Sequence, residues 1–185
     1  MAENEKYKKY TEFLDRVKKL AEDNGYRASL RRSAGKLLNV ADGKAVVNFY
    51  ATYPPEYNED QCFFVACIQC LWEVKDLAKA RPLAQTAYYM DAESREVVKK
   101  RIESLLELSW EKDGYFAAKL FRLIKFCQSK GFVIDCKKLL EDLVQWDYES
   151  CSVQKRWIKE FYNSGKEKQQ NKEQKEQEKG EENVI

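Results

Sequence analysis

Proline and glycine are scarce in this chain, and their positions constrain its fold more than any other feature. The sequence holds three prolines and seven glycines in 185 residues, and no proline follows Pro82. Five glycines fall between segments of regular apolar periodicity, where helix ends belong: Gly25, Gly43, Gly114, Gly131 and Gly165. We therefore predict an all-α fold, a helical bundle of about eight or nine helices.

Apolar residues recur at helical spacing in the segments between these breaks. A single stripe at i, i+3 and i+4 spacing runs from Tyr10 to Ala21 and predicts the first helix. A second helix is predicted over about residues 26–41. The stretch CFFVACIQCLW, residues 62–72, is apolar almost all round, so it predicts a central helix that is buried on most sides.

The second half of the chain is more regular. The stretches SREVVKKRIESLLELS, GYFAAKLFRLIKFCQSKG and CKKLLEDLVQW each carry apolar residues on one face. Asp135 is well placed to cap the third of these helices, and Ser152 or Cys151 opens the last helix. A looser stretch around KARPLAQ marks a division between two lobes near residues 76–92 of a helical domain that spans residues 1–165.

The last part of the chain differs in composition. Residues 166–185 consist mostly of Lys, Glu, Gln and Asn without apolar periodicity. Such a segment cannot bury enough apolar surface to offset the entropy of ordering it. We therefore expect a charged, disordered tail over residues 166–185.

Composition also excludes several classes of function. The chain has no histidine, which removes the commonest general base and metal ligand. The CIQC pair, Cys67 and Cys70, lies inside an apolar helical pattern and has no second CxxC to complete a zinc site. The sequence shows no nucleophile–base pair and no cluster of carboxylates. We expect neither catalysis nor a metal or cofactor.

The six cysteines and the start of the chain bear on the compartment. The opening MAENEKYKKY has no apolar export region, and no apolar run is long enough to cross a membrane. Most cysteines lie within apolar helical patterns, where a free thiol behaves as a small hydrophobic group. We expect a reducing, cytoplasmic location without membrane contact.

The basic residues are the most informative candidates for function. At about 100° per residue, Lys119, Arg122 and Lys125 lie opposite the apolar face of their helix, with no acidic residue among them. Arg27 with Arg31, and Arg32 with Lys36, are like-charge i, i+4 pairs, each of which costs about a few tenths of a kcal/mol in an isolated helix. An external anion would offset that cost.

These faces together predict contact with a phosphate backbone that does not depend on base sequence. The predicted phosphate contacts are Arg31, Arg32, Lys36, Arg101, Lys119, Arg122 and Lys125. Arg27 and Arg156 are weaker candidates, because a carboxylate across a helix interface could pair with either of them.

SLRRSAGK follows the predicted opening helix and precedes FFVACIQCLW. This order resembles the N-terminal half of the CasB family, the small subunits of type I-E CRISPR Cascade surveillance complexes. The C-terminal half is more similar, and the resemblance covers about residues 10–163. Its positions here are Arg101, Leu105, Leu106, Leu120, Leu123, Leu139, Leu140, Asp142, Leu143, Trp146, Trp157, Phe161 and Tyr162.

The resemblance implies a specific role. Such subunits are all-helical and non-catalytic, and two copies line a larger ribonucleoprotein beside the subunits that hold the CRISPR RNA. Their basic surface contacts the displaced non-target DNA strand and stabilises the R-loop. The implied partners are therefore the other Cascade subunits, the CRISPR RNA, the target DNA and a second copy. This sequence departs from the family in its tail and in carrying lysine at Lys119 and Lys125, where many relatives carry arginine.

Two other functions fit the residues. A helical adaptor would use the same basic faces to dock acidic protein surfaces, without direct contact to nucleic acid. A small helical enzyme such as a nuclease would need a metal-binding cluster of carboxylates.

Overall fold

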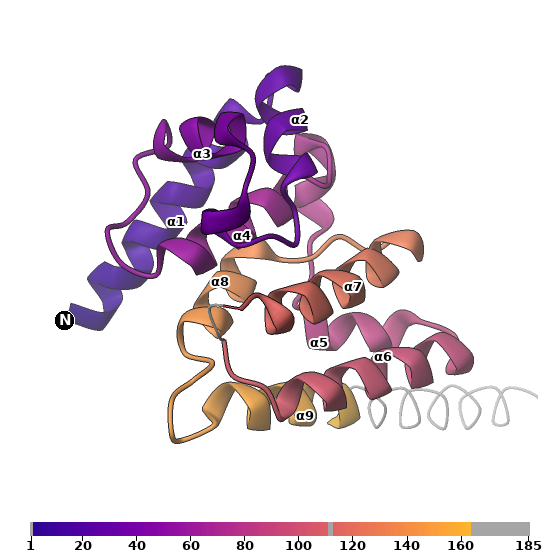
Figure 1. Cartoon of the computed structure of the whole chain (residues 1–185). Coiled ribbons are helices and arrows are strands. Elements are labelled where there is room, and N and C mark those ends of the chain that lie inside the picture. Colours follow the sequence, from indigo (N-terminus) through magenta and orange to yellow (C-terminus); the bar gives the residue numbers. More distant parts are fainter. Residues whose placement is uncertain (1, 111–112, 164–185) are drawn as a thin grey trace, which may run out of the picture.

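The computed structural model describes residues 2–110 and 113–163 of the chain. Within these ranges it contains nine α-helices and three short 3₁₀ helices, and its one β-type contact is an isolated bridge between Arg81 and Ile134 (Figure 1). The predicted all-α fold is confirmed. The helices are α1 Ala2–Leu20, α2 Asn24–Arg32, η1 Leu38–Val40, α3 Gly43–Tyr50, α4 Glu59–Gln69, η2 Val74–Lys79, α5 Leu83–Thr86, η3 Ala87–Tyr89, α6 Ala92–Leu106, α7 Tyr115–Ser129, α8 Cys136–Val144 and α9 Ser152–Asn163.

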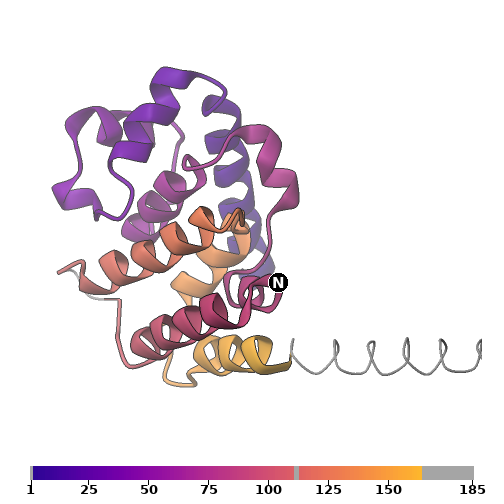
Figure 2. The same ribbon diagram turned by 90° about the vertical axis from the view of Figure 1, so that its right-hand side faces the viewer.

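The centre of the fold is α4, as the sequence predicts. Every residue from Cys62 to Cys70 is buried, and the helix packs against α1, α2, α8 and η1. In Figure 1, α1 to α4 form the upper tier, α7 and α8 the middle, and α6 and α9 the lower, and Figure 2 shows the same vertical order from the side. A helix that is apolar all round must be covered on every side. Helix α4 therefore packs against elements from both halves of the chain.

Contacts between residues far apart in sequence hold these halves together. The Gln128 side chain donates from Nε2 to the Leu71 carbonyl oxygen at 3.0 Å. The Arg81 amide donates to the Val133 carbonyl at 3.0 Å, and the Asp135 amide donates to the Arg81 carbonyl at 2.8 Å. The stretch in which a lobe division is predicted, residues 76–92, contains short helices, and the division itself stays a prediction.

The helix starts in the second half follow the sequence closely. Asp135 caps α8 by accepting from the Lys137 and Lys138 amides at 3.0 and 3.1 Å, so the predicted N-cap is confirmed. The last helix begins at Ser152, directly after Cys151, whose φ is +48°. Across the described parts of the chain, none of the helices combines the length and apolarity needed to cross a bilayer.

The second helix is shorter than predicted. The prediction placed it over about residues 26–41, but α2 ends at Arg32. Gly35 adopts the left-handed conformation, with φ +88°, and a right-handed helix does not continue through such a residue. Lys36 therefore lies outside the helix, so it does not form the predicted i, i+4 pair with Arg32.

The predicted disordered tail, residues 166–185, lies outside the described residues.

Candidate nucleic-acid interface

The face of α7 that carries basic residues is the one predicted from its periodicity. Its five predicted core residues are all buried: Phe116, Leu120, Leu123, Ile124 and Cys127. On the opposite side, Arg122 and Lys125 are exposed and Lys119 is half-buried, with its ammonium group 5.0 Å from the centre of the Tyr115 ring. The helix therefore presents three cations to the outside.

Arg101 on α6 joins this group from the neighbouring helix. Its Nη1 donates to the Arg122 carbonyl oxygen at 2.8 Å, and its guanidinium carbon lies 5.0 Å from the centre of the Phe126 ring. These contacts fix the Arg101 side chain against α7. A surface hollow of about 440 Å³ results, lined by Arg101, Ser104, Lys119, Phe121, Arg122 and Lys125.

The turn after α2 reaches the same region through Gly35. A Cβ atom at this glycine would lie 2.6 Å from Cδ1 of Phe121, so the backbone of the turn packs directly on the Phe121 ring. That contact places the end of α2 and Lys36 beside α7. Arg31 and Arg32 are exposed in the last turn of α2, while Lys36 approaches Asp42 at 3.9 Å.

A second hollow, of about 480 Å³, lies on the other flank of α2. Arg27 and Arg31 line it together with Cys70, Leu71, Trp72, Glu73, Lys75 and Asp76. Gln128 connects the two hollows: it accepts from Lys125 Nζ at 2.6 Å and donates from Nε2 to the Leu71 carbonyl at 3.0 Å. The basic residues of α2, α6 and α7 therefore belong to one connected surface.

We call this region the basic surface, and it comprises Arg27, Arg31, Arg32, Lys36, Arg101, Lys119, Arg122 and Lys125. Within the described residues, Arg31, Arg32 and Arg122 have no acidic partner, whereas the Arg27 guanidinium bonds to the Asn24 side chain at 3.0 Å. Lys36 forms the one ion pair of the set within the described residues, and at 3.9 Å in an exposed position it is weak. Glu73 and Asp76 line the same hollow as Arg27 and Arg31, and Lys75, with a smaller contribution from the Arg27 charge, lowers the pKa of Glu73. The surface therefore carries an excess of positive charge, and Arg31, Arg32 and Arg122 form no ion pair within the described residues.

Arg156 lies apart from this surface, in an ion-pair network between α8 and α9. Its Nη2 pairs with Asp142, and its Nε lies 3.9 Å from Glu160. The Asp142 carboxylate is 4% exposed and also accepts from Trp157 Nε1 at 2.6 Å. The carboxylate considered for Arg156 at the sequence level is therefore present, and the role of Arg156 in nucleic-acid binding stays a prediction.

The CIQC cysteines are buried inside the fold. Cys67 and Cys70 are both within α4 and its C-cap, and burial raises the pKa of the Cys70 thiol to about 12, against the opposing effect of the Arg27 and Arg31 charges. Burial likewise raises the pKa of Cys67 well above its ordinary value. A thiol held neutral in this way is a poor nucleophile and metal ligand. In the described ranges no three His, Cys, Asp or Glu side chains are grouped to hold a metal.

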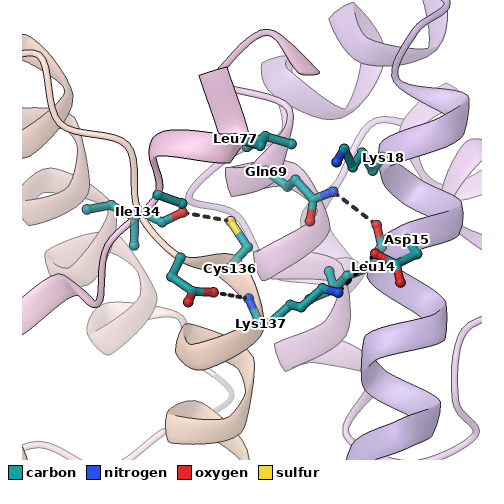
Figure 3. Close-up of a pocket in the computed structure, with 10 residues that line it drawn as sticks. Leu14, Asp15, Lys18, Gln69, Leu77, Ile134, Cys136 and Lys137 are labelled. Carbon is teal, nitrogen blue, oxygen red and sulfur yellow. Dashed lines mark hydrogen bonds and ion pairs between the residues drawn. The ribbon is translucent and has the colours of Figure 1, made fainter. Parts of the chain in front are cut away.

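A smaller hollow of about 220 Å³ lies where α1, α4, η2 and the start of α8 meet (Figure 3). Lys137 pairs with Asp15 at 3.0 Å across it, and Gln69 reaches the Leu14 backbone. Sequence analysis did not identify this hollow, because its walls come from four separate segments. Most of its polar groups pair with one another, and the Lys137–Asp15 ion pair connects the two halves of the chain. We therefore regard the hollow as a structural contact.

A model of the family described as CRISPR-associated protein Cse2 matches residues 26–162 of the chain. No curated protein matches the sequence.

Several solved structures are similar over most of their length. A CRISPR-associated protein of the Cse2 family from Thermus thermophilus has 25% identity and a TM-score of 0.66, over 83% of this chain and 97% of that one. A structure of CasB from Thermus thermophilus has 26% identity and a TM-score of 0.62, with the same coverage. A chain of a CRISPR RNA-guided surveillance complex has 19% identity and a TM-score of 0.69, over 89% of this chain and 98% of that one, so it shares the fold.

Proposed function

Because this chain belongs to the CRISPR-associated Cse2 family, we propose that it is the non-catalytic small subunit of a CRISPR RNA-guided surveillance complex. In this role the basic surface contacts the phosphate backbone of the displaced non-target DNA strand. The partners are the other subunits of the complex, the CRISPR RNA and a second copy of this chain. A chain of the same fold stands in a structure described as a CRISPR RNA-guided surveillance complex.

The observation that carries the proposal is the absence of acidic partners, within the described residues, around three arginines from two helices. Arg31 and Arg32 on α2 and Arg122 on α7 are exposed, and the turn after α2 packs on α7 where Gly35 meets Phe121. Arginine binds phosphate through two parallel N–H donors, which suits a backbone contact that ignores base identity. Contact at all three positions would bind a strand along α2 and α7.

Such binding is sufficient to affect R-loop formation. Replacing a DNA duplex by an RNA–DNA duplex is close to balanced in free energy, so a modest additional interaction shifts the equilibrium. A subunit that binds the displaced strand lowers the free energy of the open state and leaves the closed state unchanged. No catalytic step is needed for this effect.

A second function, a protein-binding adaptor, is favoured by a different part of the molecule. Val47 and Tyr53, in and after α3, are 69% and 80% exposed, and Val40 and Tyr50 nearby are 63% and 46% exposed. Exposed aliphatic and tyrosine side chains in one segment are typical of protein interfaces. This patch suits packing against another subunit, with or without nucleic-acid binding elsewhere.

The test is a salt series with fluorescent single-stranded and duplex DNA, using the full chain alone and assembled with its complex. The variant R31A/R32A/R122A is compared with wild type. We expect affinity that falls steeply with salt and is independent of sequence. On single strands the slope of log K against log salt should be smaller in the variant by about 0.7 for each lost phosphate contact.

A matched control removes the same charge elsewhere. Lys9, Lys18 and Lys159 are exposed lysines on α1 and α9, and K9A/K18A/K159A should retain the wild-type slope. If the complex assembled with R31A/R32A/R122A binds the displaced strand as tightly as the complex assembled with the wild-type chain, the adaptor function is the better account.

A further inference from the structure

The hollow between α6 and α7 combines two kinds of wall. Its rim carries four cations, Arg101, Lys119, Arg122 and Lys125, and the half-buried Phe121 ring contributes an aromatic wall. A site for phosphate alone needs only the cations. An apolar aromatic wall beneath them suits a ligand with a flat apolar face and negative charge at its edges, as in a nucleotide whose base is unstacked.

We infer that this hollow takes one unstacked base of a single-stranded nucleic acid, while the rim cations bind the flanking phosphates. The inference deepens the proposed function and depends on it, because it names the part of the strand that the basic surface holds. The volume of about 440 Å³ lies within the range of about 300–1,000 Å³ that is usual for small-ligand sites.

Two walls of the hollow, Phe121 and Arg101, are held in place before any ligand arrives. Phe121 is backed by the Gly35 backbone, which leaves no room even for a Cβ atom on that side. Arg101 is fixed by its 2.8 Å bond to the Arg122 carbonyl and by the Phe126 ring 5.0 Å away. A rigid site on helices loses little free energy in ordering its side chains when it binds.

The polar groups of the hollow do not provide a pattern that distinguishes bases. The Ser104 hydroxyl donates to the Arg101 carbonyl at 2.9 Å, so its hydrogen is already used. The remaining polar side chains are cations, and in this arrangement their N–H donors bind the flanking phosphates, which leaves none for the edge of a base. A base here is held by stacking and charge, which every base offers, and binding is therefore independent of sequence.

A hollow that accepts an unstacked base should favour single strands over duplexes. In a duplex the bases are paired and stacked, and one could enter the hollow only after it had been flipped out, which costs free energy. In a displaced strand the bases are already available. The basic surface should therefore bind a single strand more tightly than a duplex of the same sequence at the same salt concentration.

The experiment compares two fluorescent oligonucleotides of equal length with the full chain, alone and in its complex. One is oligo-dT, and the other carries tetrahydrofuran residues, which keep every phosphate but lack the bases. We expect the abasic strand to bind about 5- to 150-fold more weakly, the range for loss of one stacked base, with the same salt slope. Phe121→Leu should weaken binding of oligo-dT and leave the abasic strand unaffected.

Phe132→Leu serves as the control variant, because Phe132 is also half-buried but does not line the hollow. Equal affinity for the two strands would overturn the inference and leave backbone binding intact. If neither strand binds at low salt, both the inference and the proposed function fail. Because the two strands are compared on the wild-type protein, the test does not depend on how well either variant folds.

Discussion

Two groups of charges in this molecule differ in what surrounds them. Between α8 and α9, the buried Asp142 carboxylate is matched by Arg156, by Trp157 Nε1 at 2.6 Å and by Lys138 Nζ at 3.4 Å. On the basic surface, Arg31, Arg32 and Arg122 face solvent and have no acidic partner within the described ranges. The charges of the first group pair with one another, whereas the three arginines of the second form no ion pair within the described residues.

The difference shows that pairing, more than exposure, separates structural charges from charges available to a ligand. The Arg156 side chain is 33% exposed, yet both ends of its guanidinium face carboxylates. A buried charge without partners would be very costly, so the Asp142 group must form whenever the chain folds. An exposed arginine carries no such requirement and remains free to bind phosphate.

The largest expected effect comes from breaking the buried group. Asp142→Ala leaves Arg156 and the Trp157 N–H without their acceptor, and should lower the free energy of unfolding by about 3–5 kcal/mol. Urea unfolding followed by tryptophan fluorescence measures this change. Glu141→Ala is the matched control: it removes only a surface partner of Lys138 at 3.4 Å and should cost less than about 1 kcal/mol. Equal stability of the Asp142 variant and wild type would show that the group is not structural.

The next effect connects stability to the basic surface. In Gly35→Ala, the new Cβ meets the Phe121 ring at 2.6 Å, at a residue whose φ is +88°. We expect a loss of about 1–3 kcal/mol in stability, together with weaker single-strand binding, because the turn after α2 must move away from α7.

Gly43→Ala is the control for this substitution. Gly43 begins α3 and has no atom within 4 Å of its added Cβ, so its stability should be unchanged or higher by about 0.4–1 kcal/mol. Wild-type DNA binding by Gly35→Ala would mean that the contact between the turn and α7 does not organise the basic surface.

The smallest expected effect is a pH dependence of stability that arises from Glu160, which lies beside Asp142 and Arg156. Burial raises the pKa of Glu160, and the nearby Asp142 charge adds to the shift. A carboxyl with a raised pKa holds its proton more tightly in the folded state, so its contribution to stability falls as pH rises from the ordinary glutamate pKa through the raised value. Glu160→Gln removes this contribution.

Urea midpoints between about pH 4 and pH 7 test the effect. The stability of Glu160→Gln relative to wild type should increase with pH, by less than about 1 kcal/mol in total. Glu103→Gln, which changes an exposed glutamate on α6, is the control and should show no such trend. A difference that stays constant across the series would contradict the assignment.

Features that depend on local sequence were predicted well. The buried face of α7, the N-cap at Asp135 and the all-round burial of Cys62–Cys70 follow from periodicity and capping within one segment. Helix α3 was not predicted, because Gly43–Tyr50 is short and buries only Ala45 and Phe49. The end of α2 was predicted too late in the chain. Gly35 adopts a left-handed conformation where it packs on Phe121, and a contact between such distant residues cannot be read from the local sequence.

The sequence predicted which residues belong to the candidate site, but it did not predict how they are arranged in space. Arg31, Arg122 and Arg101 were chosen from charge patterns on separate helices, and those patterns carry no information on which helices meet. The Arg101 contact with the Arg122 carbonyl, the two hollows and the Gln128 link all depend on tertiary packing. The pairing of Arg156 with Asp142 likewise depends on how α8 and α9 pack.

The central helix also affects how the protein can be made. Helix α4 ends at Gln69, but the element that covers it most extensively, α8, spans Cys136–Val144. At a ribosomal rate of about 5–20 residues per second, α4 waits roughly 4 to 15 s for that cover. During this interval the most apolar segment of the chain has an open flank, so the nascent chain should need protection from aggregation until α8 has emerged.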